Sequence, residues 1–527
     1  MVRILNIYTI SAFVALAGVI YGFDVSSMSG VIGTSEYKSY FGNPLGTRQG
    51  AITGAIAAGS FVGALSSSFL GDWLSRKVAI QVGTVLWCIG AGVQASSNSV
   101  GMLIAGRIIS GLCIGVTSSL VPIYQSEIAP RKIRGRVVSL LHFAISWGIL
   151  IQYLIEYGCS FLNSQAVFRL PWAIQAVPAI FLFIGLFFLP RSPRWLASKD
   201  KWDEVLRVLA YLRTPNSDIN DPLVLAEYKE IEEQIRLERE SDANSYRELF
   251  RKKMRRRLFL GMAVQGLSQL TGINVVLYFI VYILQSAGTS NTLLVSSILY
   301  IIFIVATIPT ILWTDKWGRR TSLLVGSIVI AFWMFVMGGV LGRFGQPTQA
   351  KDLPYTWVII GNLPATRAVQ ASAYLASAAF AMSWGPIEWV YPPEIIPMRI
   401  RTKAVSFSTA TNWATSFTVS LVMPLLYRVI AWRLFMIYGA INVASSFFVL
   451  FFIPETKQRT LEEMDEIFEH GEPIWRSFRG IHYTARIDQL AREIEQGKGI
   501  HRIVHVELRD DIERNGHNGF GSVSSES

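Results

Sequence analysis

Twelve long apolar runs separated by polar turns constrain the fold of this chain more than any other feature. A helix of about 20 mostly apolar residues is long enough to cross the hydrocarbon core of a bilayer. Only 16% of the 527 residues are charged, against roughly 25% in soluble proteins. We therefore predict an all-α membrane protein with twelve transmembrane helices. The runs cover residues 7–32, 48–70, 78–97, 101–125, 136–158, 168–190, 258–283, 293–314, 321–342, 368–391, 403–427 and 432–454.

A polar, basic segment separates the sixth run from the seventh. It divides the chain into a six-helix bundle (1–190), a linker with short helices (191–257), a second six-helix bundle (258–455) and a partly disordered tail (456–527). The basic residues between Arg251 and Arg257 place the linker in the cytoplasm by the positive-inside rule. An even number of spans then places both termini there. Within the linker, Leu225 to Leu237 is predicted to form a charged surface helix.

Composition also excludes several classes of protein. The net charge of +11 lies mostly in short loops between apolar runs, which favours membrane orientation over nucleic-acid binding. Cys88, Cys113 and Cys159 form no Cys-x-x-Cys or Cys/His cluster, so we expect no disulfide framework and no metal site. The first run is too long for a signal peptide. The chain has no nucleophile elbow and no phosphate-binding loop, so we expect neither an enzyme nor a cofactor.

An internal repeat relates the two bundles. Glu127-x-x-Pro130-x-x-x-Arg134 follows the fourth run, and Glu394-x-x-Pro397-x-x-x-Arg401 follows the tenth with the same spacing. Similar acidic and basic turns follow the second and eighth runs, at 71–77 and 314–320. Two pseudo-symmetric bundles of this kind are typical of transporters that hold their substrate between the halves near the midplane.

The repeated motifs favour ion pairs at the cytoplasmic ends of the helices. Arginine makes forked hydrogen bonds to carboxylates, and such pairs can hold helix ends together in one conformation and release them in another. A role in topology and folding alone is the alternative. The predicted latch residues are Asp72, Arg76, Glu127, Arg134, Asp315, Arg319, Arg320, Glu394 and Arg401.

Asp24 and Arg107 are the charged residues expected inside the first and fourth spans. Charged groups within a membrane are costly and are functional candidates by default. A carboxylate near a guanidinium can act as a proton switch, because a conformational change that alters their separation loads or unloads a proton. The alternative is a permanent structural ion pair.

Uncharged amides and aromatic rings dominate the other polar positions of the spans. Gln269 and Asn274 flank the flexible pair Thr271-Gly272, and Trp389 follows Gly385-Pro386 in a helix expected to be broken. Amides both donate and accept hydrogen bonds, as sugar hydroxyls require, whereas an anion would need converging basic residues. This pattern favours a neutral polyhydroxylated solute.

Several motifs resemble the sugar porter family of the major facilitator superfamily, with the closest likeness to fungal monosaccharide transporters. The resemblance extends from Asn6 to about Met464. It implies the major facilitator fold, alternating access, a central monosaccharide site and a plasma-membrane location. Proton-coupled members have Asp at the position of Asp24, and facilitative animal members have Asn, although uncoupled members with Asp also exist. The motifs are Arg107-Ile-Ile-Ser-Gly111, Pro122-x-Tyr124-x-x-Glu127-x-x-Pro130, Pro190-Arg-Ser-Pro193-Arg194-Trp195, Gln269-Leu-Thr-Gly-Ile-Asn274, Asp315-Lys-Trp-Gly-Arg319-Arg320 and Pro454-Glu455-Thr456-Lys457.

The chain departs from the family pattern at five positions. The family usually has Gln at the position of His142, a second Gln at Ser268 and often Asn at Phe303. Glu388 replaces a small residue or Pro, and its role stays open between a titrating group and one that faces water. Arg191 replaces Glu, which should weaken the first latch. Phe303 should favour pentoses such as xylose or arabinose over glucose, and His142 either substitutes for Gln as a neutral group or senses pH.

We therefore expect a plasma-membrane sugar:proton symporter that functions as a monomer, with a neutral sugar, the proton and the lipid bilayer as its partners. The alternatives are a facilitative hexose carrier, a sugar sensor with little flux, and a carrier of a polyol or an acid. The residues predicted to bind substrate are His142, Ser268, Gln269, Asn274, Tyr278, Phe303, Trp389 and Asn412.

Overall fold

The computed structural model describes residues 7–130, 133–214, 216–240, 246–348, 353–397 and 400–457, with Met464 and Phe468. The chain divides into two compact units. The first contains Met1–Trp195 and Asp242–Arg479, and it holds the helical bundle. The second contains Leu196–Ser241 and Gly480–Ser527. The predicted tail, 456–527, lies almost entirely outside the described residues.

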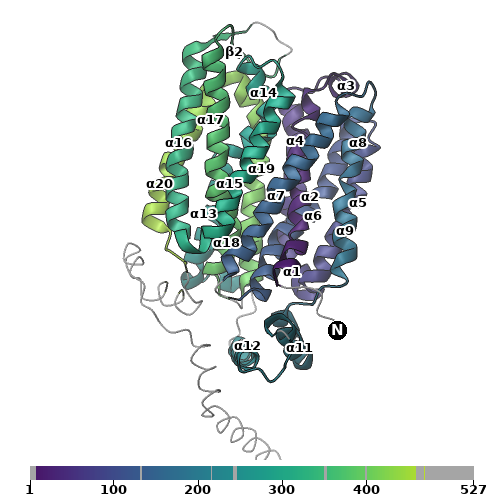
Figure 1. Ribbon diagram of the computed structural model, residues 1–527, viewed down its shortest axis with the longest axis vertical. Coiled ribbons are helices and arrows are strands. Elements are labelled where there is room, and N and C mark those ends of the chain that lie inside the picture. The colour runs from purple at the N-terminus through teal and green to yellow at the C-terminus, as the bar shows by residue number, and fades with distance from the viewer. Residues whose placement is uncertain are drawn as a thin grey trace, which may run out of the picture. The chain divides into compact units, whose positions relative to one another are not determined.

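The first half of the bundle is built from helices of residues 7–186. In Figure 1 these helices, in purple to blue, gather on one side of the bundle. Their bounds are α1 Ile7–Val14, α2 Leu16–Ser27, η1 Val31–Gly33, α3 Ser35–Tyr40, α4 Thr47–Trp73, α5 Arg76–Ala95, α6 Val100–Ile128, α7 Arg134–Cys159, α8 Ala166–Ile174 and α9 Ala176–Leu186.

The second half repeats this arrangement with residues 252–452, in green to yellow on the other side of the bundle (Figure 1). A two-stranded antiparallel ribbon, in which Gln346 pairs with Val358, is inserted before α17. The elements are α13 Lys252–Leu270, α14 Ile273–Ser286, α15 Thr292–Trp317, α16 Arg319–Phe344, β1 Gly345–Pro347, β2 Trp357–Ile359, α17 Leu363–Met382, α18 Trp384–Ile395, α19 Arg401–Ile430 and α20 Arg433–Phe452.

Eleven helical segments in the described part of the chain are long and apolar enough to cross a membrane. Of the twelve predicted runs, the tenth is not among these eleven segments. It consists of α17, whose Arg367, Gln370 and many small residues lower its hydropathy, and α18, which follows after a break at Ser383. With this helix pair in the tenth position, the chain has the predicted all-α fold of two six-helix bundles.

Four of the described spans are divided into two helices, and the divisions in the seventh and tenth lie close to predicted site residues. The seventh span breaks between α13 and α14, where Gly272 adopts a left-handed φ of 85°. This conformation is strained for any residue with a Cβ atom, so glycine is needed at that position. The first span breaks at Ala15 and the tenth at Ser383. The sequence predicted the breaks near Gly272 and Gly385, but not the one at Ala15.

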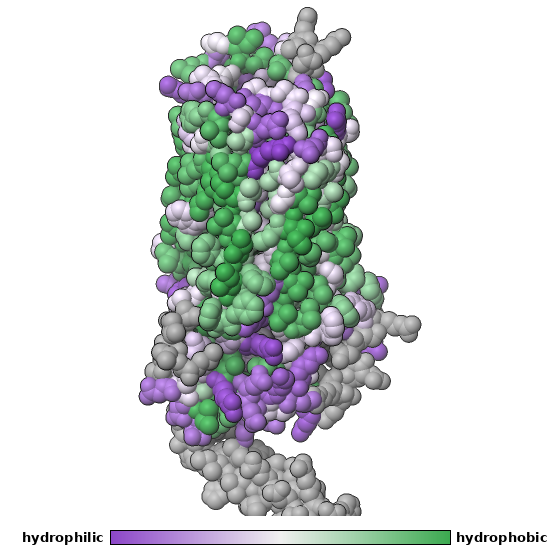
Figure 2. Space-filling model, turned by 90° about the vertical axis from the view of Figure 1, so that its right-hand side faces the viewer, coloured by the Kyte–Doolittle hydropathy of each residue, from purple (hydrophilic) through white to green (hydrophobic). Residues whose placement is uncertain are grey.

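The surface of the bundle is suited to lipid. One face is hydrophobic over its middle height and hydrophilic toward its ends (Figure 2). Large apolar side chains are exposed on the spans, including Phe181 at 64% and Phe332 at 57%. Water-soluble proteins rarely expose so much apolar surface, so these side chains indicate contact with lipid.

Helices α4 and α6 pack backbone to backbone. A Cβ atom on Gly59 would lie 2.1 Å from the carbonyl oxygen of Ile108, and one on Gly115 would lie 2.1 Å from that of Ser60. Gly63 and Gly111, each four residues away along its helix, are as tightly placed. Small residues at this spacing let membrane helices approach closely. The contact fixes α6, and therefore Arg107, within the first half.

The second unit contains the helices of the linker. The described elements are α11 Trp202–Arg213 and α12 Pro222–Glu240, and the helix predicted from Leu225 to Leu237 lies within α12. Arg213 forms a forked ion pair with Glu227, with N–O distances of 2.6 and 2.7 Å, which joins the two helices. Of the remaining linker elements, α10 Pro193–Ser198 crosses the boundary between the units, and η3 Tyr246–Phe250 belongs to the first unit.

Candidate functional site

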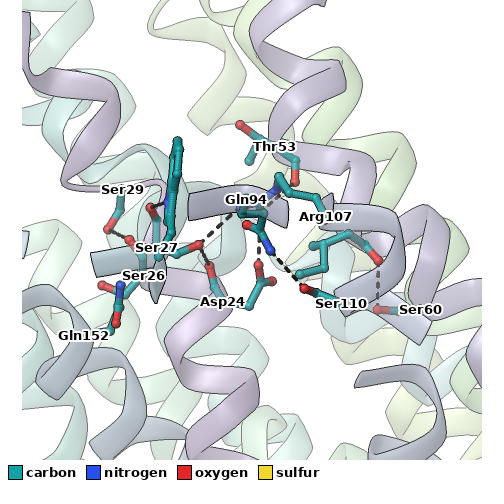
Figure 3. Close-up of polar contacts among 12 residues, drawn as sticks. Asp24, Ser26, Ser27, Ser29, Thr53, Ser60, Gln94, Arg107, Ser110 and Gln152 are labelled. Carbon is teal, nitrogen blue, oxygen red and sulfur yellow. Dashed lines mark hydrogen bonds and ion pairs between the residues drawn. The ribbon is translucent and has the colours of Figure 1, made fainter. Parts of the chain in front are cut away.

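Asp24 and Arg107 form an ion pair in the interior of the first half (Figure 3). Arg107 Nη2 donates to Asp24 Oδ1 at 3.0 Å, and the two side chains are 0% and 1% exposed. Arg107 also donates to the Ser27 hydroxyl at 3.3 Å and to the Thr53 carbonyl at 3.4 Å. The two charged residues that the sequence predicts inside the first and fourth spans therefore lie in direct contact.

The Asp24 carboxylate keeps one acceptor unused. Its Oδ2 atom has no hydrogen-bond partner among the residues that the structure describes. The backbone around it is held by Ser27, which donates to the Asp24 carbonyl at 2.8 Å, and by Trp172, which donates to the Ser27 carbonyl. A fixed carboxylate with one free oxygen beside a guanidinium can accept a proton without any rearrangement of its neighbours.

A chain of amides lines the second half. The side-chain amide of Asn274 donates to Gln269, and Gln269 donates to Asn412 Oδ1 at 3.1 Å. Asn412 in turn donates to Gln265 Oε1 at 2.6 Å and to Glu388 Oε2 at 3.2 Å. Three of the predicted substrate-binding residues thus lie in direct contact, and they come from α13, α14 and α19.

Aromatic rings from both halves meet beside the amides. Tyr21 on α2 lies edge-on to Trp389, with ring centroids 6.3 Å apart, and to Trp413, at 5.1 Å. Trp413 also donates to Ser118 of the first half at 3.1 Å. A pyranose ring presents C–H groups that pack against such faces. Trp389 is 2% exposed and therefore is not an interfacial anchor.

His142 and Phe303 are neighbours across the two halves. Their ring centroids are 5.7 Å apart, and Phe380 stacks on Phe303 at 6.4 Å. His142 also packs against Gly385, where a Cβ atom would lie 2.3 Å from the imidazole. Neither His142 nitrogen has a hydrogen-bond partner among the described residues. The phenyl rings of Phe303 and Phe380 therefore narrow the space beside His142. Both nitrogens of the His142 imidazole are available to a ligand.

The remaining predicted residues, Ser268 and Tyr278, are also buried. Ser268 lies on α13, and Tyr278 lies on α14 one helical turn after Asn274. Of the eight predicted substrate-binding residues, all except Asn274 are buried, so the structure represents a closed state.

The first latch lies at one end of the bundle. This end carries Arg76 and Arg319, and we call it the latch end. Arg76 pairs with Glu127 at 3.4 Å and with the half-exposed Asp72 at 3.2 Å. Arg76 also donates to Thr402 of the second half at 3.2 Å. Ser192 donates to the other oxygen of Glu127 at 2.5 Å.

The second latch follows the same plan. Arg319 makes a forked pair with Glu394, with distances of 2.7 and 3.1 Å, and Thr456 donates to Glu394 at 2.6 Å. Glu455 accepts hydrogen bonds from the backbone amides of Arg319 and Arg320 and thereby caps α16. The guanidinium of Arg320 donates to the Leu450 carbonyl at 2.5 Å.

The two latches differ where the sequence predicted a difference. Arg191 occupies the place that Glu455 takes in the second half, and its guanidinium lies 5.4 Å from the Trp195 ring centre instead of capping α5. Arg401 donates to the Ile396 carbonyl at 3.2 Å, and Arg134 is the first residue of α7. The side chain of Asp315 lies outside the described part of the chain.

An open cavity of about 280 Å³ lies at the opposite end of the bundle, between the halves. Lys38 and Asn43 line it from the first half, and Tyr282 and Gln285 line it from the second. Burial lowers the pKa of Lys38 below its usual value. Tyr282 stands one helical turn beyond Tyr278, so this cavity lies above the predicted substrate contacts.

Several residues of the site were not predicted. Gln265 precedes Gln269 by one helical turn, and Tyr21 precedes Asp24 by three residues, so helical spacing placed both on the functional faces. Ser192 and Thr456 donate to the latch glutamates. The Pro-x-Ser and Pro-x-Thr pattern after the last span of each half would have identified them as a repeated pair.

Comparison with known proteins identifies the family. Residues 4–468 match the family model described as "Sugar (and other) transporter". This chain belongs to that family. Sugar transporters move their substrate across a membrane without converting it, so this multi-pass membrane protein is a transporter and not an enzyme.

Relatives of the transporter include fungal proteins named for glucose. It is 45% identical over 509 residues to the MFS glucose transporter mfs1 of Aspergillus flavus, with 94% of this chain and 96% of that protein covered. It is 40% identical over 481 residues to a high-affinity glucose transporter of Kluyveromyces lactis, with coverages of 90% and 87%.

Solved structures of the proton:xylose symporter XylE share its fold. The form bound to 6-bromo-6-deoxy-D-glucose gives a TM-score of 0.75 at 26% identity and covers 88% of this chain and 99% of that chain. The inward open form from E. coli gives 0.65 at 27% identity, with coverages of 88% and 100%.

Proposed function

We propose that this sugar transporter is a proton symporter in which Asp24 carries the proton. The observation that supports the proposal is the buried Asp24–Arg107 pair, in which Oδ2 is left without a partner. Protonation of Asp24 would remove its charge and release Arg107 toward Ser27 and Thr53, which it already contacts. The proton would thereby change the packing of α2 against α6.

We propose that the sugar binds between the amide chain and the aromatic rings. Gln269, Asn274 and Asn412 would supply donors and acceptors for hydroxyls, and Trp389 would cover the C–H face of the ring. Tyr21 lies on α2 three residues before Asp24, and its ring contacts those of Trp389 and Trp413. Sugar and proton would therefore be bound by adjoining groups.

The proposed transport cycle is alternating access, with the latches closed in the state described here. Arg76 and Thr402 connect the halves at the latch end, as do Ser67 and Ser406 at 2.7 Å. At the opposite end, Tyr300 donates to Ser29 at 3.2 Å. These contacts would break in turn as one half rocks against the other. We further propose that the latch end faces the cytoplasm of a cell whose plasma membrane holds the protein.

The residues beside His142 lead us to propose that the sugar is a pentose. Phe303 occupies the region beside His142, and its stack with Phe380 leaves less room for an exocyclic hydroxymethyl group. The second candidate is a hexose, which is favoured by the relatives named as glucose transporters. The experiment is uptake of labelled xylose, arabinose and glucose in cells without their own sugar carriers, with and without a protonophore.

The outcomes separate the alternatives. Uptake that collapses with the protonophore supports symport, and uptake that survives it indicates a facilitator in which Asp24 and Arg107 are structural. The ranking of the three sugars decides between a pentose and a hexose. Absence of uptake of every sugar would overturn the transport proposal and favour a sensor.

A further inference from the structure

Glu388 introduces an acid into a group of buried side chains whose other polar members are mostly neutral. It lies on α18 between Ile387 and Trp389, and it is 4% exposed. Asn412 donates to its carboxylate at 3.2 Å, while Ser268 Oγ and Trp389 Nε1 have no hydrogen-bond partner among the described residues. The Asn412 amide is uncharged, so it supports a carboxylate without neutralising it.

No cation of the protein balances this charge in the part of the chain that the structure describes. Arg107 is the guanidinium near the middle of the first half, and it is already paired with Asp24. The other described ion pairs of the bundle, those of Arg76 and Arg319, lie at the latch end. A buried charge without a counter-ion is costly, so Glu388 is expected to have a positive partner during the transport cycle.

The surroundings of Glu388 are suited to a small organic cation. Trp389 follows it in the chain, and the ring of Tyr21 lies beside the rings of Trp389 and Trp413. The centroid of Tyr21 is 6.3 Å from that of Trp389 and 5.1 Å from that of Trp413. An ammonium group is attracted both to a carboxylate and to the faces of aromatic rings.

The pocket also retains the groups needed for hydroxyls. The amide chain runs from Asn274 through Gln269 to Asn412 and ends on Glu388. One side of the site therefore offers amides, and the other offers a negative charge beside aromatic rings. A pyranose that carries one protonated amino group has the complementary arrangement.

We propose that this transporter also carries protonated amino sugars, such as 2-amino-2-deoxyhexoses, with the ammonium group bound by Glu388 and its aromatic neighbours. The proposal rests on the sugar site described above and adds a cationic class of substrate to the neutral one. The same charge should disfavour sugar acids, because their carboxylate would face Glu388.

The first test needs only the wild-type protein. Glucosamine and 2-deoxyglucose are compared as inhibitors of labelled glucose uptake, at a mildly acidic pH at which the amine is protonated. The two inhibitors differ from glucose at the same carbon, and only one of them is charged. Glucosamine should inhibit at a concentration at least about tenfold lower, as expected for a hydrogen bond between charged groups.

The second test uses Glu388→Gln, which keeps the shape and the acceptor for Asn412 but removes the charge. The variant should lose the advantage of glucosamine, measured within the variant as the ratio of the inhibitory concentrations of glucosamine and 2-deoxyglucose, whatever its overall rate of transport. Glu156→Gln is the matched control, because Glu156 is also buried but lies on α7, where it accepts from the Gly30 amide at 2.9 Å. The control should keep the glucosamine advantage.

Each other result would overturn the proposal. If glucosamine does not compete while glucose is transported, the amino-sugar proposal fails and the sugar-transport proposal stands. If Glu388→Gln weakens all the sugars equally, the carboxylate binds hydroxyls instead of an ammonium. If it changes mainly the pH profile of glucose uptake, the cation at Glu388 is a proton. Absence of transport of any sugar by the wild type would refute both proposals.

Discussion

Replacement of Asp24 by Asn tests the proposed proton site and allows its magnitude to be worked from the structure. The substitution keeps the size of the side chain and removes the charge that faces Arg107 at 3.0 Å. Both partners are at most 1% exposed, so Arg107 would be left as an uncompensated buried cation. Loss of one partner of such a pair costs about 3–5 kcal/mol. We expect the low end of this range, because the Asn oxygen can still accept a hydrogen bond.

The assay has a stability part and a transport part. Thermal unfolding of the purified protein should show a lower Tm for Asp24→Asn, and Asp24→Asn combined with Arg107→Gln should recover part of the loss. Asp72→Asn is the surface control, because Asp72 is half-exposed in its pair with Arg76 and an exposed pair contributes only about 0–1 kcal/mol. In transport, Asp24→Asn should still equilibrate sugar across the membrane but should no longer accumulate it.

Two results would contradict this reasoning. Accumulation of sugar by Asp24→Asn against its gradient would show that the proton is carried elsewhere. A Tm equal to that of the wild type would show that Arg107 is already stabilised without Asp24, and that the pair is not coupled to the state of the bundle.

Three further substitutions test other parts of the molecule. Phe303→Asn should raise glucose uptake relative to xylose by roughly fivefold, about 1 kcal/mol for one new hydrogen bond to a hydroxyl, and an unchanged ratio in the uptake assay would refute the pentose proposal. Arg191→Glu should raise the Tm, because a carboxylate at the N-terminus of α5, as Glu455 provides for α16, contributes about 1 kcal/mol. Gly272→Ala should abolish uptake, because its Cβ atom would lie 2.6 Å from the Tyr438 ring. Gly46→Ala is the control, since Gly46 also has a positive φ but has no neighbour within 4 Å, and this variant should be tolerated. Equal uptake by the two variants would argue against a role for the Tyr438 contact.

The fold could be predicted because the bilayer imposes a simple rule on the sequence. Runs of apolar residues at membrane length have to be helices, since backbone groups cannot otherwise be satisfied in lipid. The breaks at Gly272 and near Gly385 were predictable from residues that weaken helices. The break at Ala15 was not, because Val14, Ala15 and Leu16 include no residue that weakens a helix.

The site was predictable where a residue is unusual for its surroundings. Asp24 and Arg107 stand out in apolar spans, and the structure brings them together. Gln265 and Tyr21 were missed although each lies about one helical turn from a predicted residue, Gln269 or Asp24, and so on the same face of its helix. The contact of His142 with Phe303 was also beyond the sequence, since it joins α7 and α15 across the two halves.

The backbone contact between α4 and α6 also bears on how such a chain can acquire a different substrate. Any side chain at Gly59 or Gly115 would have to displace the main chain of the facing helix, so this half has few neutral substitutions open to it. The corresponding pair in the second half, α15 and α17, contains no glycine and packs through side chains. Most of the amides and the acid of the pocket belong to that second half. Changes of sugar preference during evolution should therefore accumulate between residues 258 and 455, while the packed pair α4 and α6, which holds Arg107, changes little.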